Sequence, residues 1–375
     1  MKTQVLKENL KQALFVVERA TAKTPTLPVL GAIAIVAGKN TLELSATDLE
    51  IGIRYKFLAK TEKEGGVAVP SRLFSQLIGV LPEKEISLAL VGGELHIDSK
   101  EQQTNIKTLS LEDFPIIPSL KGEQEAVEVE TKAFCMGLSS VVGMTGQNQT
   151  RPEISGVLIS LSKEQMKLAA TDSFRLAEKS LSFEKPQQTE ASFILPQKTV
   201  KELISIFSDL PGKIKLYLSP TQALFDYSLK EQMGSPSLQV VSRLIEGEYP
   251  QYQDVIPRDF ATKAQLSRQE LISRIKAAAV FSGKMQDAKV IADPKKKGLE
   301  ISSESADAGR HSSFLSANVT GERLEIAFNW RFLLEGLSNM KGDEVEIGFG
   351  GEDAPALVRP IGKEQYLYVV MPVKA

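Results

Sequence analysis

The sequence predicts an α+β protein built from three similar domains in tandem, because two kinds of marker recur along its 375 residues. The segment 42–48, LELSATD, resembles MKLAATD at 166–172 with an offset of 124, and a weaker copy, LEISSE, lies at 299–304. The second marker is a short apolar run before a helix-like segment, and it lies at 67–70, 193–196 and 326–329. The agreement indicates a repeat of about 125 residues, long enough for each copy to have its own core.

Each copy is predicted to contain a helix, several strands, a second helix and further strands, so that a helix–strands unit occurs about six times. In the first copy Leu10 and Leu14 recur at the spacing of an amphipathic helix. In the third copy Ser267 and Glu270 have the spacing of a capping box before Leu271, which predicts that a helix begins there.

Extended, proline-bearing connectors mark the expected domain boundaries. They occupy 113–118 and 248–257. Proline favours extended backbone around it, which is typical of a linker. The predicted domains are 1–122, 123–256 and 257–375.

The composition excludes several classes of protein. Hydrophobic residues make up 42% and charged residues 25%, the proportions of an ordinary globular protein. No apolar run reaches the ~20 residues that span a bilayer, so no membrane partner is expected. Cys135 is the only cysteine, which predicts a reducing, cytoplasmic compartment. His96 and His311 are the only histidines, so neither a multi-histidine metal site nor a cofactor is expected.

Motifs for catalysis are missing from the sequence. No Walker-type phosphate loop occurs, and Gly348 and Gly350 lack the third glycine of a dinucleotide fingerprint, since Asp353 stands in its place. Asp48 and Asp172 occupy matching places in two copies, which favours side chains that cap a turn after a strand over a catalytic pair. An enzyme with two such carboxylates stays an alternative, but no nucleophile or metal cluster accompanies them. We therefore expect no enzymatic activity and no catalytic residues.

Positive charge is concentrated around the first helix of each copy. Segments 2–23, 130–151 and 263–289 carry net charges of +3, +1 and +4, so the rest of the chain carries −10 in a total of −2. Basic helices on an acidic body suit contact with phosphates that ignores nucleotide sequence. The plain alternative is a set of solvated helix faces.

Six short motifs together resemble those of one family over the full length of the chain. They are TLPVLG (26–31), SATDLE (45–50), RPEISGV (151–157), TDSFRLA (171–177), EYP (248–250) and VVMPV (369–373). The chain closely resembles the bacterial sliding clamps, the β subunits of DNA polymerase III. The resemblance implies a head-to-tail homodimeric ring with helices lining a central hole and antiparallel sheets outside. It also implies a non-catalytic ring that encircles duplex DNA, tethers the replicative polymerase, and is opened by an ATP-driven clamp loader.

The family layout turns the basic helices toward the hole. The residues expected to face DNA are Lys7, Lys11, Lys23, Arg72, Arg151, Lys198, Arg274, Lys276 and Arg331. Their contacts would be with the DNA backbone, which permits sliding.

The family also has an apolar pocket between the second and third domains, which binds short peptides of polymerases, the loader and repair proteins. By motif it maps onto Ile154, Thr171, Ser173, Phe174, Arg175, Leu176, Pro250, Val255, Val369, Met371, Pro372 and Val373. Met371 is expected to form a flexible wall, and Arg175 to pack its stem on apolar surface with its charged head at the rim. Phe174 stands where the family often has His, and the chain ends Lys374-Ala375 where many members end Arg-Leu.

The subunit interface is expected between the end of the first domain and the first helix of the third. Ile106 facing Val280 and Phe281 is the predicted apolar contact. A rival hypothesis is a dimeric peptide-binding hub that never contacts DNA.

Overall fold

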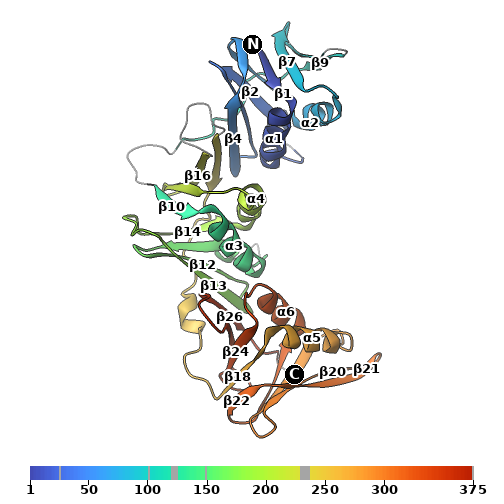
Figure 1. Cartoon of the computed structure of the whole chain (residues 1–375), viewed down its shortest axis with the longest axis vertical. Helices are drawn as coiled ribbons and strands as arrows, with labels where there is room; N and C mark the ends of the chain where they lie inside the picture. The colour runs from blue at the N-terminus through green and yellow to red at the C-terminus, as the bar shows by residue number, and fades with distance from the viewer. Residues whose placement is uncertain (25–26, 100–101, 120–125, 148–149, 229–236, 374–375) are drawn as a thin grey trace. The chain divides into compact units, whose positions relative to one another are not determined.

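The computed structural model describes the chain except residues 25–26, 100–101, 120–125, 148–149, 229–236 and 374–375, so Lys374 and Ala375 lie outside the described part. The described residues group into two compact units, each treated by itself below (Figure 1). The first unit contains 1–133 and 202–244, and the second contains 134–201 and 245–375. No helix among the described residues combines the length and apolarity needed to cross a membrane.

Two sheets and two complete helices form the first unit. The helices are α1 (Lys7–Val17) and α2 (Ser71–Val80). The smaller sheet has the order β5 (Lys60–Lys63), β1 (Lys2–Leu6), β7 (Glu85–Val91), β8 (Glu94–Asp98), β9 (Gln103–Lys107). The larger sheet has the order β10 (Val127–Glu130), β15 (Lys213–Leu218), β16 (Gln222–Ser228), β17 (Ser237–Arg243), β4 (Ile51–Leu58), β3 (Thr41–Thr47), β2 (Ala32–Gly38), β6 (Gly65–Pro70).

The second unit has the same plan. Its helices are α5 (Arg268–Ala279) and α6 (Trp330–Ser338), which lie side by side in Figure 1, while α3 (Thr131–Val141) and α4 (Gln197–Phe207) contribute residues to both units. The larger sheet has the order β14 (Ala191–Pro196), β11 (Gly156–Leu161), β12 (Gln165–Thr171), β13 (Arg175–Ser182), β26 (Tyr366–Val370), β25 (Ala356–Pro360), β24 (Glu344–Phe349), β18 (Thr262–Ser267), β22 (Asn318–Gly321). The smaller sheet has the order β21 (Gly309–Ser316), β20 (Gly298–Ser305), β19 (Asp287–Asp293), β23 (Leu324–Asn329).

The two large sheets join strands of neighbouring sequence copies. In the first unit β17 pairs antiparallel with β4, and in the second β13 pairs antiparallel with β26, where Leu176 stands opposite Val369. The predicted α+β class and its antiparallel sheets are confirmed, but the sequence repeat did not predict that sheets run across copy boundaries. The hydrogen bonds of each large sheet therefore fix one copy to the next.

The proline-bearing connectors pack onto these sheets. In the first unit Ile117 is buried against Leu224 and Val241, and Arg54 donates hydrogen bonds to the carbonyl oxygens of Ile117 and Pro118. In the second unit the connector is held in a similar way by buried Tyr252. Each connector therefore covers one face of a large sheet, whose apolar side chains it removes from water.

The matching turns at Asp48 and Asp172 show the repeat at atomic detail. The Asp48 carboxylate accepts hydrogen bonds from two backbone N–H groups at 3.0 and 2.9 Å, and Asp172 does so at 3.0 Å twice. Both turns contain a residue with positive φ, Leu49 at 77° and Ser173 at 78°. The prediction that both carboxylates cap turns is confirmed, and so is the cap of α5, where the Ser267 hydroxyl accepts from the N–H of Glu270.

We expect Gly336→Ala to lower the thermal stability of the second unit. A Cβ at Gly336 on α6 would lie 2.4 Å from ring atoms of Tyr368. Tyr368 cannot move aside easily because it is buried and its hydroxyl donates to the carbonyl of Phe332 at 2.8 Å. Overpacking of this kind costs about 1–3 kcal/mol, measurable by thermal or urea unfolding. Ser338→Ala on the exposed side of the same helix is the control, and a wild-type midpoint for Gly336→Ala would contradict the packing described.

Candidate peptide and nucleic-acid binding sites

The β13–β26 pair brings together the two motif groups that the sequence assigned to a peptide site. Leu176 faces Val369 across the pair, and one residue beyond β26 the N–H of Met371 donates to the carbonyl of Phe174 at 2.9 Å. The N–H of Val373 then donates to the carbonyl of Ala327 at 2.8 Å. Segments nearly 200 residues apart in sequence therefore form one continuous surface, defined by their strand register.

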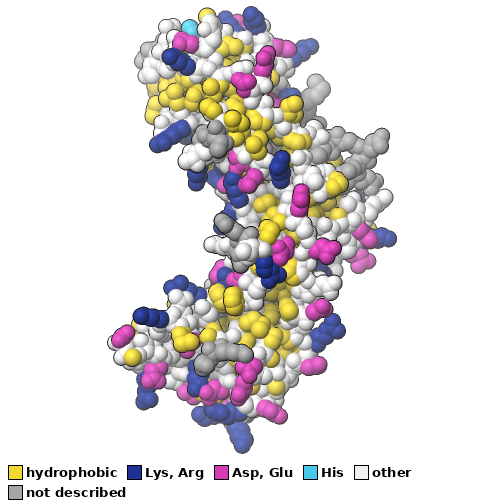
Figure 2. Space-filling model, turned by 180° about the vertical axis from the view of Figure 1, so that it is seen from behind, with side chains coloured by type: hydrophobic (Ala, Val, Ile, Leu, Met, Phe, Trp, Pro, Cys, Tyr) yellow, Lys and Arg dark blue, Asp and Glu magenta, His cyan; other side chains and the backbone are white. Residues whose placement is uncertain are grey.

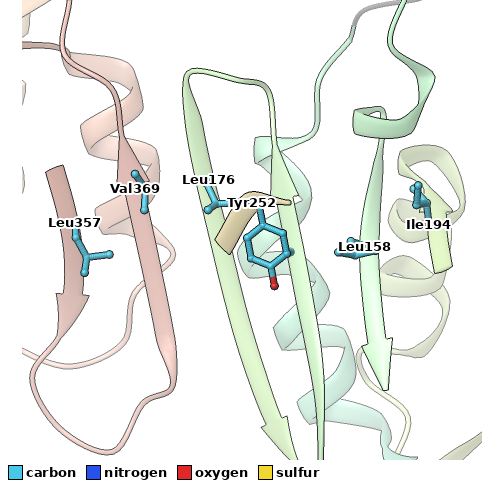
Figure 3. Packing of buried hydrophobic residues seen from close by; sticks show 7 residues of the cluster. Leu158, Leu176, Ile194, Tyr252, Leu357 and Val369 are labelled. Carbon is cyan, nitrogen blue, oxygen red and sulfur yellow. The ribbon is translucent and has the colours of Figure 1, made fainter. Parts of the chain in front are cut away.

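A buried apolar cluster lies under this surface (Figure 3). Tyr252, from the short 3-10 helix Tyr252–Val255, packs with Leu176 and Leu158 on one side of the junction, and the cluster continues to Val369 and Leu357. The Tyr252 hydroxyl donates to the buried Glu178 carboxylate at 2.5 Å. Burial raises the pKa of the Tyr252 hydroxyl, and the bond to Glu178 raises it further, so the phenol stays protonated as a donor.

Tyr249 ties the same connector to the end of β12. The N–H of Thr171 donates to the Tyr249 hydroxyl at 3.0 Å, and the rings of Tyr249 and Tyr252 meet edge to face with centroids 6.3 Å apart. Because burial raises the pKa of Tyr249, its oxygen remains a neutral acceptor. The connector is therefore fixed against the sheet at two tyrosines close in sequence.

The predicted peptide residues divide into a buried base and an exposed rim. Ile154, Leu176 and Val369 are buried and cannot be contacted directly without rearrangement. Phe174 is 62% exposed, and Val255 and Met371 also present apolar surface. The remaining members lie between these extremes or carry polar side chains at the surface: Thr171, Ser173, Pro250, Pro372 and Val373. We define the candidate peptide surface as Phe174, Val255 and Met371.

Arg175 corrects the sequence prediction for the rim. Its side chain is largely buried, and its guanidinium donates to Asp172 at 2.9 Å, to the Gly143 carbonyl at 3.1 Å, and to Glu335. Burial alone would lower the pKa of Arg175, but the hydrogen bonds to Glu335 and Asp172 raise it above its ordinary value. The charged head is therefore held by these acceptors and joins β13 to α6.

The basic residues predicted to face DNA mostly lie on exposed helix positions. Three of them hold the second place of α2, α4 and α6, namely Arg72, Lys198 and Arg331. Others are exposed on α1, after it, and on α5: Lys11, Lys23, Arg274 and Lys276. The face in Figure 2 carries basic and acidic side chains intermixed, so these residues are defined by helix position rather than by a patch in that view.

Two of the predicted DNA contacts form hydrogen bonds within the chain. Lys7 is half-buried at the start of α1, and its ammonium group donates to the Leu81 carbonyl. Arg151 is exposed, but it bonds Glu153 at 3.1 Å and the Ser173 hydroxyl at 3.2 Å. Arg151 therefore lies beside the turn of the candidate peptide surface, and its contact with DNA stays a prediction.

The residues of the predicted apolar interface contact differ in how much surface they expose in the single chain. Ile106 on β9 is only 3% exposed within its own chain, because its side chain faces inward from the sheet. Val280, directly after α5, is 71% exposed, and the ring of Phe281 stacks on His311 with centroids 5.6 Å apart. The third copy therefore presents an apolar surface at Val280, while Ile106 has almost none to offer it.

The described residues show no grouping of His, Cys, Asp and Glu that could hold a metal ion.

Family models of the N-terminal, central and C-terminal domains of the DNA polymerase III beta subunit match residues 1–118, 128–251 and 253–374. The chain belongs to the DNA polymerase III beta subunit family. Its three domains are therefore clamp domains, as the sequence motifs predicted.

Similarity to individual beta subunits extends over the whole chain. The chain is 28% identical to the beta sliding clamp of Synechococcus elongatus and 26% identical to that of Bacillus subtilis. In each case the match covers the full length of this chain and at least 99% of the relative. The solved Bacillus subtilis clamp superposes with a TM-score of 0.93 at 25% identity, covering 100% of this chain and 99% of that one. The Pseudomonas aeruginosa clamp, solved with griselimycin bound, shares the fold with a TM-score of 0.91 at 23% identity, again over both full lengths.

Sequence reasoning missed several residues that build the apolar cluster under the candidate peptide surface. Tyr252 and Glu178 anchor the connector, and Leu357 completes the base of the cluster. Tyr249 was part of the EYP motif but was given no role of its own. A signal for Tyr252 existed, since an aromatic residue in a connector often packs on the adjacent sheet. The sequence carried no such signal for Leu357, because only the folded sheet shows that β25 pairs with β26 and places Leu357 opposite Val369.

Proposed function

We propose that this chain is a processivity clamp that acts in the cytoplasm during DNA replication, where it encircles duplex DNA and tethers the replicative polymerase. The observation that carries the proposal is the match of all three clamp domains along the whole chain. A tether must hold DNA without reading its sequence. Topological enclosure supplies residence time, and screened contacts between basic side chains and phosphates permit sliding. No catalytic step is required.

The ring we propose is a head-to-tail homodimer. Three clamp domains in one chain become six in two chains, and two identical heterologous junctions close a ring if the rotation per subunit is correct. Lys11, Lys23, Arg72 and the exposed basic residues of α5 would contact the DNA backbone from the helices. A sedimentation measurement tests this proposal: we expect twice the mass of one chain at micromolar concentration, and a monomer would contradict a closed ring of six domains.

Partners are proposed to bind through the candidate peptide surface. These are the polymerase, the clamp loader and other proteins that carry short clamp-binding peptides. Apolar anchors of such peptides would cover Phe174, Val255 and Met371. The side chain of Met371 is unbranched and can adopt several rotamers.

We expect Met371→Ala to weaken binding of a polymerase tail peptide by about 1–3 kcal/mol, since the substitution removes apolar contact area at an anchor position. Isothermal calorimetry measures the effect. Met136→Ala, at another exposed methionine on α3, is the matched control and should bind as wild type. The mass of the dimer and its retention on DNA should stay normal in both. Unchanged affinity in Met371→Ala, or loss of the dimer together with binding, would argue against a separate peptide surface.

A further inference from the structure

One face of the large sheet in the second unit is divided into an apolar half and a polar half. The apolar half, which includes Leu176 and Leu357, lies under the connector residues Tyr252 and Phe260. A Cβ at Gly348 on β24 would lie 2.4 Å from the ring of Phe260, so the connector also covers that strand. Further along the same strands the side chains are polar, and they line a groove of about 580 Å³.

The groove has an ordered floor because strand register sets its residues side by side. The strands follow one another in the order β12, β13, β26, β25, β24, β18. Glu178 stands opposite Leu367, Arg359 opposite Glu346, and Glu346 opposite Gln265. Residues two apart on one strand share a face, so this row and Lys167 on β12 project into the same groove.

The carboxylates that line the groove are held by partners of their own. Glu178, whose side chain is 9% exposed, accepts from the Tyr252 hydroxyl at 2.5 Å and lies 3.5 Å from the Lys167 ammonium group. Glu364 accepts from Lys179 at 2.9 Å and also from a backbone N–H. These negative charges are therefore compensated within the chain.

Glu346 is held in the same way on the other side of the groove. It accepts from Gln265 at 3.0 Å and from the Nε of Arg359 at 2.9 Å. Burial alone would raise the pKa of Glu346, but these hydrogen bonds lower it below its usual range, so the carboxylate stays ionised.

The cations of the groove are more accessible than its carboxylates. The side chain of Lys167 is 37% exposed and that of Arg359 is 52% exposed, against 14% for Glu346. Lysine has three donors and arginine five, so each retains N–H groups for a further acceptor. A ligand that enters the groove therefore meets two cations above carboxylates that are already neutralised.

The spacing of these two cations matches an extended peptide. Lys167 and Arg359 lie three strand spacings apart, roughly 14 Å. In an extended chain, residues i and i+4 point to the same side and lie about 14 Å apart. Between the two cations, Leu367 supplies an apolar floor, and the amides of Gln165 and Gln365 can both donate to and accept from a peptide backbone.

We propose that this groove binds an extended acidic peptide segment of a partner protein. Carboxylates at positions i and i+4 contact Lys167 and Arg359, and an apolar side chain at i+2 covers Leu367. The candidate peptide surface is a different site, because Phe174, Val255 and Met371 are not among the residues that line the groove. A nucleic-acid strand fits less well, since it carries a charge at every nucleotide and would place phosphates over the apolar floor.

Fluorescence anisotropy with a labelled GESLSEG peptide tests the proposal. The groove variant Lys167→Gln with Arg359→Gln should bind this peptide about tenfold more weakly than wild type, since two charged contacts are lost. The matched control is Lys289→Gln with Arg323→Gln, which removes two cations of similar exposure from ion pairs with Glu325 and should bind as wild type. Wild-type affinity in the groove variant, or an equal loss in both variants, would overturn the proposal.

Reversing the charges separates recognition from folding. Lys167→Glu with Arg359→Glu should prefer a GKSLSKG peptide to GESLSEG, an inversion that a loss of stability does not produce. A folded reversal variant that still prefers the acidic peptide would contradict the assignment of the two cations. If the reversal prevents folding, the glutamine variant decides the question by itself.

Two further measurements distinguish this groove from the other proposed sites. Met371→Ala should bind GESLSEG as wild type, and a loss there would assign the peptide to the candidate peptide surface and overturn the groove. A labelled oligothymidylate should bind the groove variant and its control equally, and a loss confined to the groove variant would indicate a nucleic-acid site instead. The groove lies within one chain, so a protein that sediments as a monomer and still shows the expected peptide affinities would contradict the ring alone.

Discussion

Val280→Glu is expected to convert the dimer into monomers. The side chain is exposed in the single chain, so the substitution should leave each domain folded and act only where a second chain covers it. Burying an unpaired carboxylate at an apolar contact costs several kcal/mol, and a ring with two identical junctions incurs the cost twice. Sedimentation equilibrium over a concentration series measures the shift.

Leu58→Glu is the matched control for this experiment. Leu58 is an exposed apolar residue on β4, and the substitution adds the same charge away from the proposed junction. Its dimer dissociation constant should equal that of wild type. A Val280→Glu protein that stays dimeric at wild-type concentrations would show that Val280 lies outside the interface.

Arg274→Ala combined with Lys276→Ala is expected to flatten the salt dependence of DNA binding. Both side chains are exposed on α5, which the proposed ring turns toward DNA. Each lost phosphate contact reduces the slope of log affinity against log salt concentration by ~0.9, because fewer counterions are released. Fluorescence anisotropy with a short duplex over a salt series gives the slope.

The control for charge alone removes two lysines from the β19–β20 hairpin. Lys295→Ala with Lys296→Ala changes the net charge by the same amount at exposed residues off the helices. This variant should keep the wild-type slope. Equal slopes for the α5 variant and wild type would place Arg274 and Lys276 away from the DNA backbone.

The repeat was predictable because its marker is a structural necessity. Asp48 and Asp172 cap equivalent turns in which Leu49 and Ser173 adopt positive φ, so the local sequence must supply a side-chain acceptor in both copies. Local chemistry of this kind is visible in one dimension. The α5 cap at Ser267 was predictable for the same reason.

Other features depend on which strand lies next to which, and the sequence carries no local sign of that. The pairing of β13 with β26 and the packing of the connectors are decided by long-range contacts.

The orientations of Arg175 and Ile106 are different cases. Successive residues of a strand point to opposite faces, so an inward Leu176 already required Arg175 to point the other way, and the same alternation turns Ile106 inward on β9. The error for Arg175 came from treating the motif 171–177 as one surface.

Retention on circular against linear DNA tests the central claim most directly. The protein is loaded onto a nicked circular plasmid with a bacterial clamp loader and ATP, separated from free protein by gel filtration, and then the plasmid is cut once with a restriction enzyme at the same salt. A ring that encloses DNA should stay on the circle and leave after the cut, because a free end lets it slide off. Equal retention before and after the cut, or no retention on the circle, would contradict topological enclosure and favour a peptide-binding protein that does not encircle DNA.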